Sequence, residues 1–465
     1  MDPILPPPAD AGPTETVLTP ADMPIPEILD APFSHLCGPA GTGKTWMARA
    51  MVAQRPGTVL AATTGIAAVN LGEGCTTINA LLRYFDTASL RDMYVSGQLT
   101  VRLGKLACAG VKRIVIDEVS MMDGDQLTYL TQSIDELSGE GYILDNETAE
   151  RMAKKELDPI AITLVGDFAQ LPPVKAPFAF ESSQWKRYSE AAYTLTTIHR
   201  QADVEFIKAI QAARVGNTKL VGDYFGPRLK TAVNPDFDGA TILATNDAVA
   251  RFNALRMDKL TTEKVQFASK PWGLQRGDWK NIPALFDLKV GALVMLLANQ
   301  RSMGDEDHGG PGRIIYANGD FGHIVEIDRA HSEVWVELVR NKQVVSVEWV
   351  TRTNTIPLEV GRRKAIRAEP YVEGAPAERI DGKMEIIGTV TYLPVRVAYA
   401  TTVHKSQGLS LDQVQVDIRE GFFKAPSMLY VALSRARTVE GLHLVGSVDT
   451  LRTRCTVDAR VAKWL

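Results

Sequence analysis

The sequence predicts an α/β fold with two parallel-sheet domains. In the first part of the chain, short apolar runs at 59–62, 114–116 and 160–165 alternate with helix-compatible segments, a pattern typical of buried parallel strands. The same rhythm starts again near Thr241 and resumes late in the chain, at 395–400, 414–416 and 442–445. We therefore expect two similar α/β domains, the second of which is interrupted.

Length and composition agree with a folded protein of several domains. The 465 residues correspond to two to four domains at roughly 100–200 residues each. The chain has 45% hydrophobic and 23% charged residues, a composition that excludes collagen-like, coiled-coil and wholly disordered proteins. The net charge of −4 gives no global basic field, so a groove for nucleic acid would have to be local.

The cysteines and the hydropathy pattern point to a cytoplasmic protein. Cys37, Cys75, Cys108 and Cys455 lie far apart without a C-x-x-C pair, which argues against a zinc module or a disulfide framework. The sequence has neither an apolar stretch of about 18 residues nor a basic region followed by an apolar run at its start. We therefore expect no membrane span and no secretory signal.

The first domain is expected over 33–200, after a proline-rich leader at 1–32. Frequent prolines disfavour a helix or a central strand, so we expect this leader to be loose. Within the domain, 83–109 separates two predicted strands, and Ser96-Gly97 lies between two apolar segments, as in a hairpin turn. The sequence thus predicts a small β-hairpin insertion there.

A second, barrel-like insertion is predicted over 290–390. Residues 333–337 and 345–349 alternate apolar and polar side chains, with glycine and asparagine near the turns, which is typical of antiparallel strands. The second α/β domain is accordingly expected in two pieces, 201–289 and 391–465.

Residues 38–45 read GPAGTGKT and fit the phosphate-loop pattern G-x-x-x-x-G-K-[ST] between a predicted strand and a predicted helix. Glycines let consecutive backbone amides curl around phosphate oxygens, and the helix N-terminus adds partial positive charge. Lys44 is expected to neutralise the β- and γ-phosphates, and the Thr45 hydroxyl to hold Mg²⁺. The predicted phosphate-binding residues are Gly38, Gly41, Thr42, Gly43, Lys44 and Thr45.

The apolar run 114–116 ends in two acids, Asp117 and Glu118. The carboxyl edge of an open α/β sheet is where ligands bind. We expect Asp117 to hold the metal through its water shell and Glu118 to orient the attacking water. A helix N-cap followed by an acid is the alternative for the pair taken alone; beside Lys44 we favour hydrolysis of a nucleoside triphosphate.

The following predicted strand ends in GDFAQLPP at 166–173, which brings Gln170 to the same edge. A neutral amide can donate to a phosphate and accept from water at once, as a sensor of the γ-phosphate needs. An ordinary glutamine in a turn is the alternative for Gln170 on its own.

With these residues in place, the chain resembles the superfamily 1B DNA helicases, the group that contains RecD, the PIF-type enzymes and phage Dda. The resemblance extends from about Phe33 to about Gly446 and rests on blocks that follow the family's order. These blocks are GPAGTGKT at 38–45, ATTGIAAVNL at 62–71, IDEVSM at 116–121, GDFAQLPPV at 166–174, IHRQ at 198–201, YATTVHKSQGLSLD at 399–412 and YVALSRAR at 430–437.

The resemblance implies two RecA-like P-loop NTPase domains that use ATP and Mg²⁺. It also implies a β-hairpin pin at 83–109 and an SH3-like barrel at 290–390. Arg200 and Arg435 correspond to arginine fingers of the family. A guanidinium brought to the γ-phosphate from across a cleft stabilises transition-state charge and makes hydrolysis depend on domain closure.

Some nucleotide-contacting positions differ from the family's pattern. Asp22 stands near the place of a glutamine that reads adenine, which puts base selectivity in doubt. His199 replaces a tyrosine that commonly stacks on the base, and an imidazole stacks less extensively. Gly408 would let the backbone approach the nucleotide closely.

Two matching sets of small polar residues, one in each domain, are predicted to contact the nucleic-acid backbone without reading its sequence. Closing the cleft on ATP would bring the sets together, as the inchworm movement of the family implies. Tyr84, Phe85 and Phe168 are candidates for base stacking, and the basic residues at 362–367 either touch DNA or form a solvated face. The predicted nucleic-acid-binding residues are Thr63, Thr64, Thr77, Asn79, Phe85, Thr401, Thr402, His404 and Lys405.

The function implied by the family is that of a monomeric ATP-dependent DNA helicase that moves 5′ to 3′ on single strands and opens duplex junctions, in the cytoplasm of a bacterial or phage-infected cell. A loading partner is not specified by the sequence. An RNA or mixed-substrate helicase is one alternative, because backbone contacts do not exclude a 2′-hydroxyl. The other is an ATP-switched single-strand clamp or adaptor subunit, for which a degraded Lys44, Glu118 or Arg435 would be expected; all three are present.

Overall fold

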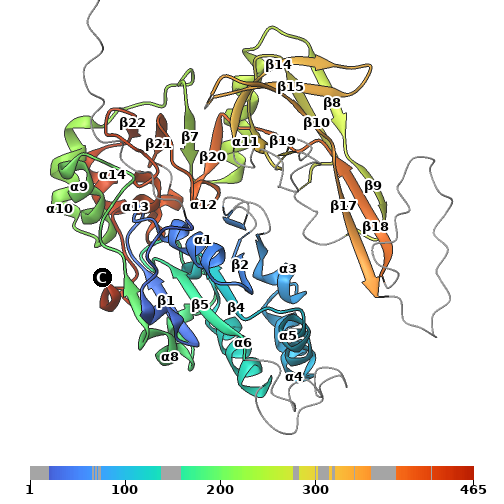
Figure 1. The fold of residues 1–465 in the computed structure, drawn as a ribbon. Coiled ribbons are helices and arrows are strands. Elements are labelled where there is room, and N and C mark those ends of the chain that lie inside the picture. The colour runs from blue at the N-terminus through green and yellow to red at the C-terminus, as the bar shows by residue number, and fades with distance from the viewer. Residues whose placement is uncertain are drawn as a thin grey trace, which may run out of the picture.

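The computed structural model shows two α/β domains that face each other and a β-rich insertion attached to the second (Figure 1). It describes residues 20–64, 67–68, 71, 75–137, 159–275, 282–298, 300–301, 314–316, 320–339, 341–357, 384–419 and 421–465. The basic residues at 362–367 and most of the proline-rich leader lie outside this part of the chain.

The first domain contains a parallel sheet, as its apolar runs predict, and this sheet has six strands among the described residues. Alternate side chains of the strands pack on opposite faces. Leu36 and Val115 share a hydrophobic cluster with helix α1 (Lys44–Gln54), and Ile114 shares another with α6 (Gly124–Leu137). In spatial order the strands are β3 (Thr76–Thr77), β2 (Thr58–Ala62), β4 (Arg113–Asp117), β5 (Ala161–Gly166), β1 (Phe33–Cys37) and β6 (Ala192–Thr194).

The second domain has a smaller parallel sheet of four strands among its described residues. In spatial order they are β20 (Ala400–Thr402), β7 (Ala240–Leu243), β21 (Val414–Asp417) and β22 (Leu442–Val445). The helices of this domain are α9 (Val204–Arg214), α10 (Thr218–Phe225), α11 (Asn246–Asp258), α12 (Val403–Ser406), α13 (Met428–Leu433) and α14 (Val448–Arg454).

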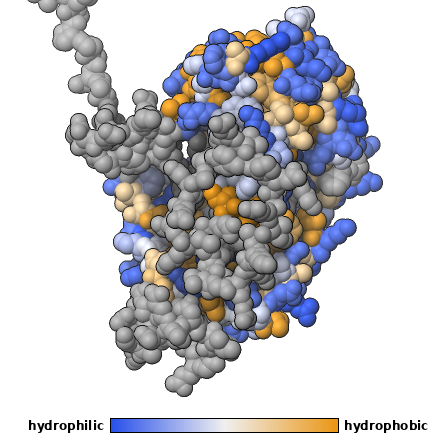
Figure 2. All heavy atoms as spheres, turned by 90° about the vertical axis from the view of Figure 1, so that its right-hand side faces the viewer, coloured by the Kyte–Doolittle hydropathy of each residue, from blue (hydrophilic) through white to orange (hydrophobic). Residues whose placement is uncertain are grey.

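Antiparallel strands with a hydrophobic core of their own occupy the β-rich insertion. Hydrophilic and hydrophobic residues are interspersed over the described surface on this side of the molecule (Figure 2). One sheet has the order β16 (Val344–Val347), β15 (Glu333–Leu338), β14 (Phe321–Asp328), β11 (Leu293–Leu296) and β19 (Val395–Val397). The other strands are β8 (Lys264–Ala268), β9 (Lys270–Gly273), β10 (Leu285–Lys289), β12 (Gln300–Arg301), β13 (Ile314–Tyr316), β17 (Val350–Pro357) and β18 (Met384–Tyr392).

The predicted bounds of this insertion, 290–390, were too narrow. Strand β8 pairs with β10 before residue 290, and β9 pairs with β18. At the other end, 395–400 does not form one parallel strand: β19 pairs antiparallel with β11, and only β20 joins the parallel sheet. The strands of the insertion therefore extend from β8, which begins at Lys264, to β19, which ends at Val397. That the insertion is SH3-like stays a prediction.

The β-hairpin predicted at 83–109 is wrong, because this segment forms helices α4 (Thr87–Val95) and α5 (Gln98–Cys108). Asp86 and Ser89 form a reciprocal capping box that starts α4. The buried side chains of α5 include Leu99, Leu103 and Leu106, which recur with helical and not strand spacing. Gly97, with φ of +74°, does form the predicted turn, but the turn joins two helices.

The end of the leader is part of the first domain. Residues 27–30 form a 3₁₀ turn whose Leu29 is fully buried in the cluster around α1. The side-chain amide of Gln54 donates hydrogen bonds to the carbonyl oxygens of Pro20 and Met23. The expected boundary at Pro32 is therefore too late.

Among the described residues, no helix is long and apolar enough to cross a lipid bilayer. The helical elements not yet named are short. They are α3 (Ile78–Leu82), α8 (Trp185–Ser189), and the 3₁₀ turns η1 (Glu27–Asp30), η2 (Val119–Met121), η3 (Ala179–Glu181), η4 (Gly226–Arg228), η6 (Gly421–Lys424) and η7 (Ala462–Trp464).

Candidate active site between the two α/β domains

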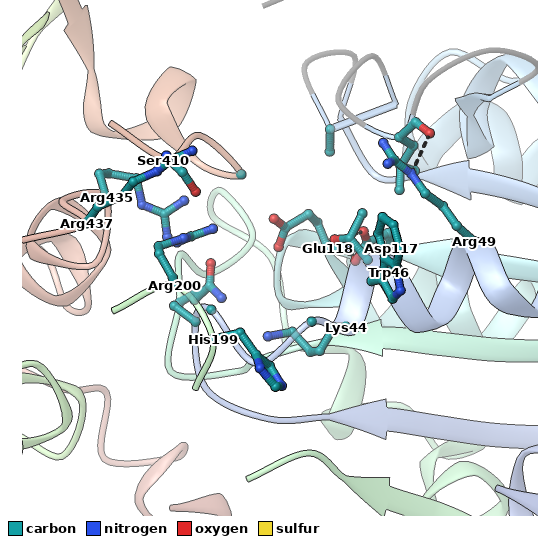
Figure 3. Close-up of a pocket in the computed structure, with 18 residues that line it drawn as sticks. Lys44, Trp46, Arg49, Asp117, Glu118, His199, Arg200, Ser410, Arg435 and Arg437 are labelled. Carbon is teal, nitrogen blue, oxygen red and sulfur yellow. Dashed lines mark hydrogen bonds between the residues drawn. The ribbon is translucent and has the colours of Figure 1, made fainter. Parts of the chain in front are cut away.

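A cavity of ≈ 550 Å³ lies at the carboxyl ends of β1 and β4, where side chains of both domains meet (Figure 3). Figure 3 shows Lys44, Asp117 and Glu118 on one side and Arg200, Arg435 and Arg437 on the other. The predicted catalytic residues are thus brought together. The cavity is lined by Ala40, Gly41, Gly43, Lys44, Thr45, Trp46, Arg49, Ala67, Leu71, Asp117, Glu118, Gln170, His199, Arg200, Gly408, Ser410, Arg435 and Arg437.

The phosphate loop has the geometry that its glycines predict. Gly41 and Gly43 have φ of +85°, which L side chains rarely adopt. A Cβ at Gly38 would lie 2.4 Å from the carbonyl oxygen of Leu195. Buried Thr42 donates its hydroxyl to the carbonyl of Pro39 at 2.9 Å, which closes the loop.

Lys44 lies buried at the start of α1 and faces the inside of the phosphate loop. Its Nζ donates hydrogen bonds to the carbonyl oxygens of Gly38 and Pro39, at 2.7 and 2.9 Å. Burial lowers the pKa of Lys44, while the nearby carboxylates of Asp167 and Glu118 oppose this shift. Two of the three ammonium donors thus hold the loop, and the third can face a polyphosphate that the loop holds.

Asp117 and Thr45 form an oxygen pair that fits a hard divalent cation. The Thr45 hydroxyl donates to Asp117 Oδ2 at 3.0 Å. Burial raises the pKa of Asp117, so a neighbouring cation would stabilise its ionised form. A hydroxyl and a carboxylate are ligands that Mg²⁺ uses together with water and phosphate oxygens.

Glu118 has a backbone in the left-handed region, with φ of 58°. Burial is the main cause that raises the pKa of Glu118 to about 7, and the negative charge of Asp117 is the second. Its Oε2 accepts a hydrogen bond from Gln407 Nε2 at 2.9 Å. A carboxylate with these properties can accept a proton near neutral pH.

Gln407 is a site residue that the sequence analysis missed. Besides Glu118, its amide nitrogen reaches Gln170 Oε1 at 3.3 Å, so one buried side chain of the second domain contacts two predicted catalytic residues of the first. Its position directly before Gly408, within the block at 399–412, was the available signal. Gly408 lines the cavity with φ of +80°, a conformation that L side chains rarely adopt, and its close approach to the nucleotide stays a prediction.

The two predicted arginine fingers lie next to each other. Arg435 is only 1% exposed, and its guanidinium donates to Val431 O and to the hydroxyl of Ser434. Arg200 Nη1 donates to Ser434 O at 2.9 Å. Burial is the main cause that lowers the pKa of Arg435 to about 9, and the positive charge of Arg200 is the second. An anion between them would relieve this repulsion.

Trp46, Arg437 and Gln201 were not among the predicted site residues, whereas the nearby His199 was. Exposed Trp46 follows Thr45 on α1, and Arg437, which pairs with Asp412 at 3.3 Å, extends the cationic wall. His199 is also exposed, and its backbone amide donates to Gly41 O at 2.8 Å. Gln201, buried beside it, donates to Ala436 O at 2.7 Å and so ties this segment to the turn after α13.

The two predicted sets of nucleic-acid-binding residues occupy equivalent places in the two domains. Strands β3 and β20 are edge strands of their sheets, and each leads into a short helix. Thr77 caps α3 by accepting from Ala80 N, and Thr402 caps α12 by accepting from Lys405 N. These hydroxyls thus also have a local structural role, which their sequence does not reveal.

The other members of these sets differ in their surroundings. Thr63 donates to the carbonyl of Glu118 at 2.8 Å, which connects this set to a predicted catalytic residue. Thr64 accepts from Ala67 N at 3.2 Å, and the Asn79 amide donates to Phe85 O at 3.3 Å.

Thr401 is half-buried on β20, Lys405 donates to Asn246 Oδ1 at 3.2 Å, and burial lowers the pKa of His404. Of the aromatic rings considered for stacking, Phe85 is 65% exposed. The prediction that Tyr84 and Phe168 stack on bases is wrong, because both rings are buried in the core.

Comparisons with known proteins agree with this architecture. Residues 30–221 match the family model of the PIF1-like helicases. The chain is 30% identical to human ATP-dependent DNA helicase PIF1 over 91% of its own length and 59% of that protein, and 26% identical to Pif1 of a Psychrobacter species over 89% and 66%. The chain thus spans less than two thirds of the length of these relatives.

Solved structures show the same fold. A crystal structure of Pif1 from Candida albicans matches with a TM-score of 0.67 at 23% identity and covers 95% of this chain and 99% of that one. Bacteroides Pif1 bound to single-stranded DNA matches with a TM-score of 0.59 at 22% identity over 95% and 96%. Pif1 of a Bacteroides species in complex with ADP-AlF4 matches with a TM-score of 0.63 at 22% identity over 95% and 96%.

Proposed function

Because residues 30–221 match the family model of the PIF1-like helicases, we propose that this chain is an ATP- and Mg²⁺-dependent DNA helicase. The proposal includes movement from 5′ to 3′ on single-stranded DNA and opening of duplex junctions. Relatives named as ATP-dependent DNA helicases, and a related structure bound to single-stranded DNA, support the reaction class and the substrate.

The observation that carries the proposal is that one cavity receives acids and a lysine from the first domain and arginines from the second. A site completed by two domains depends on how they are placed, so hydrolysis can be coupled to their movement. Since both parts of this site come from one chain, we also propose that the monomer is active.

The predicted catalytic residues have proposed tasks in hydrolysis. Lys44 neutralises charge on the β- and γ-phosphates, and Glu118, held by Gln407, orients a water and accepts its proton. Arg200 and Arg435 stabilise the charge that develops on the transferred phosphoryl group. Gln170 reports the state of the γ-phosphate to the second domain through Gln407.

Thr45 and Asp117 are the residues that would hold Mg²⁺. When bound, this ion supplies charge neutralisation and orientation of the phosphate oxygens. The base of the nucleotide is proposed to lie against the exposed rings of Trp46 and His199 at the open side of the cavity.

For DNA, we propose that the two capped edge strands, β3 with Thr77 and β20 with Thr402, contact the backbone at two points of one strand. Exposed Phe85 is proposed to stack on a base. Nucleotide-dependent movement of the domains then changes the distance between these two contacts and advances the chain along the strand.

The test is ATP hydrolysis with and without single-stranded DNA, for the wild type, Lys44→Ala and the surface control Lys186→Ala, whose ammonium is highly exposed. We expect DNA-stimulated hydrolysis by the wild type and the control, and its loss in Lys44→Ala, because the charge partner of the phosphates is removed. Hydrolysis retained by Lys44→Ala would contradict the phosphate-loop assignment, and stimulation by RNA alone would contradict the DNA substrate.

A further inference from the structure

Tyr430 connects the phosphate loop directly to the second domain. This tyrosine lies on α13 and is 1% exposed. Its hydroxyl accepts a hydrogen bond from the backbone amide of Ala40 at 2.7 Å and donates one to Asp167 Oδ2 at 2.9 Å. One side-chain atom of the second domain thus contacts two loops of the first.

Ala40 is fixed on both sides by groups of the nucleotide site. The carbonyl of Pro39 accepts from the Lys44 ammonium, and the carbonyl of Gly41 accepts from the backbone amide of His199. A change in the shape of this loop would therefore shift the amide that Tyr430 contacts.

Asp167 holds the other end of the contact. It follows β5 and accepts two hydrogen bonds from the guanidinium of Arg214, at the end of α9, at 2.9 and 3.2 Å. Asp167 is buried and the Arg214 side chain is only 15% exposed. Burial beside Asp167 raises the pKa of Tyr430 well above its usual value, so its hydroxyl stays protonated and able to donate.

The same short segment carries Arg435. The Nε of Arg435 donates to the carbonyl of Val431, the residue after Tyr430, at 2.9 Å. A second donor of this guanidinium reaches the Ser434 hydroxyl at 2.8 Å. Its Nη1 also reaches the carbonyls of Ser406 and Leu409, at 3.4 and 3.3 Å. The guanidinium is therefore fixed within the second domain, and its position relative to the phosphate loop depends on how this domain docks through α13.

We propose that Tyr430 is a positioning residue that docks α13 on the phosphate loop and thereby sets Arg435 in place for hydrolysis. This inference rests on the proposed ATPase function and assigns to Tyr430 the coupling between the loop at Ala40 and the arginine. When Tyr430 leaves Ala40, a buried backbone amide loses its partner, so partial docking is disfavoured. The contact therefore favours two discrete arrangements of the domains.

The experiment is the kinetics of DNA-stimulated ATP hydrolysis by Tyr430→Phe, which keeps the ring and removes only the hydroxyl. We expect kcat to fall by at least about five-fold, the lower end of usual coupling strengths, while the Kd for ATP changes by less than about two-fold. The matched control is Tyr188→Phe, because the Tyr188 hydroxyl is also fully buried but bonds Thr131 within the first domain; its kcat should stay at the wild-type value.

A double-mutant cycle with Arg435→Lys separates positioning from a general structural effect. If Tyr430 acts through the arginine, Tyr430→Phe should cause little further loss of kcat in the Arg435→Lys background. Fully additive losses, wild-type kcat in Tyr430→Phe, or an equal loss in Tyr188→Phe would each overturn the inference. A wild-type chain without DNA-stimulated hydrolysis would instead contradict the proposed function itself.

Discussion

Glu118 combines an uncommon backbone conformation with an uncommon side-chain environment. Its φ of 58° turns the chain directly after β4, so the side chain lies in the cavity while the backbone carbonyl accepts from Thr63. Burial, together with Asp117, raises the pKa of this glutamate to about 7. Such local cost and pKa shift are typical of functional residues.

Replacing Glu118 with glutamine should stop turnover without loss of binding. The amide keeps the size of the side chain and an oxygen that accepts from Gln407, but it does not take a proton from water. We expect hydrolysis to fall by about 10²–10⁴-fold, with nucleotide and DNA affinities near those of the wild type. Binding titrations and steady-state hydrolysis check this, with exposed Glu205→Gln as the control. Lost nucleotide binding would mean that Glu118 supports the structure.

Side chains adjacent to strand ends could be predicted from the sequence, whereas contacts across the domain interface could not. Lys44, Thr45 and Asp117 follow apolar strands, so their meeting at one sheet edge follows from the topology. The partners of Gln407 and Tyr430 in the site are hundreds of positions away. No local pattern encodes such a distance.

Helices α4 and α5 show how a local pattern can be misread at the level of an element. The segments around Ser96-Gly97 are apolar enough for strands, and the expected hairpin used only the turn and this apolarity. The capping box at Asp86 and the spacing of the buried leucines of α5 were the stronger signals. The periodicity of the apolar residues and the presence of capping residues determine whether a segment is a helix or a strand more strongly than a single turn residue does.

A substitution in α5 tests this arrangement. Leu103 is fully buried against the core of the first domain, so Leu103→Ala should lower the free energy of unfolding by about 2–5 kcal/mol. Val95→Ala, at a side chain that is 74% exposed, should change it by less than about 0.5 kcal/mol. Chemical denaturation of the two variants measures the difference. Equal, small effects would contradict the burial of α5 against the core of the first domain.

For the whole molecule, the parallel sheets and the shared cavity could be predicted, but the extent of the insertion could not. The apolar runs identified the central strands of both sheets and the interruption of the second domain, but not the short strands β3 and β6, and they merged β19 with β20. The ends of the insertion depend on long-range pairs, β9 with β18 and β11 with β19. Such pairs link residues far apart in the chain, and alternation alone does not give their register.

The arrangement of the domains carries the central claim, that ATP hydrolysis drives movement along DNA. Gln407, Tyr430 and Arg435 bring groups of the second domain to the catalytic loops of the first. Thr77 and Thr402, which cap α3 and α12, lie at the ends of the edge strands β3 and β20 of the same two domains. Movement of one domain against the other therefore changes both the site of hydrolysis and the proposed DNA contacts.

The most direct test is ATP-dependent unwinding of two matched DNA duplexes, one with a 5′ and one with a 3′ single-stranded tail, with Lys44→Ala as the control. We predict that the wild type opens only the 5′-tailed duplex and that Lys44→Ala opens neither. Opening of only the 3′-tailed duplex would contradict the proposed direction. Opening of neither duplex, despite DNA-stimulated hydrolysis, would contradict the helicase and favour an ATP-switched clamp.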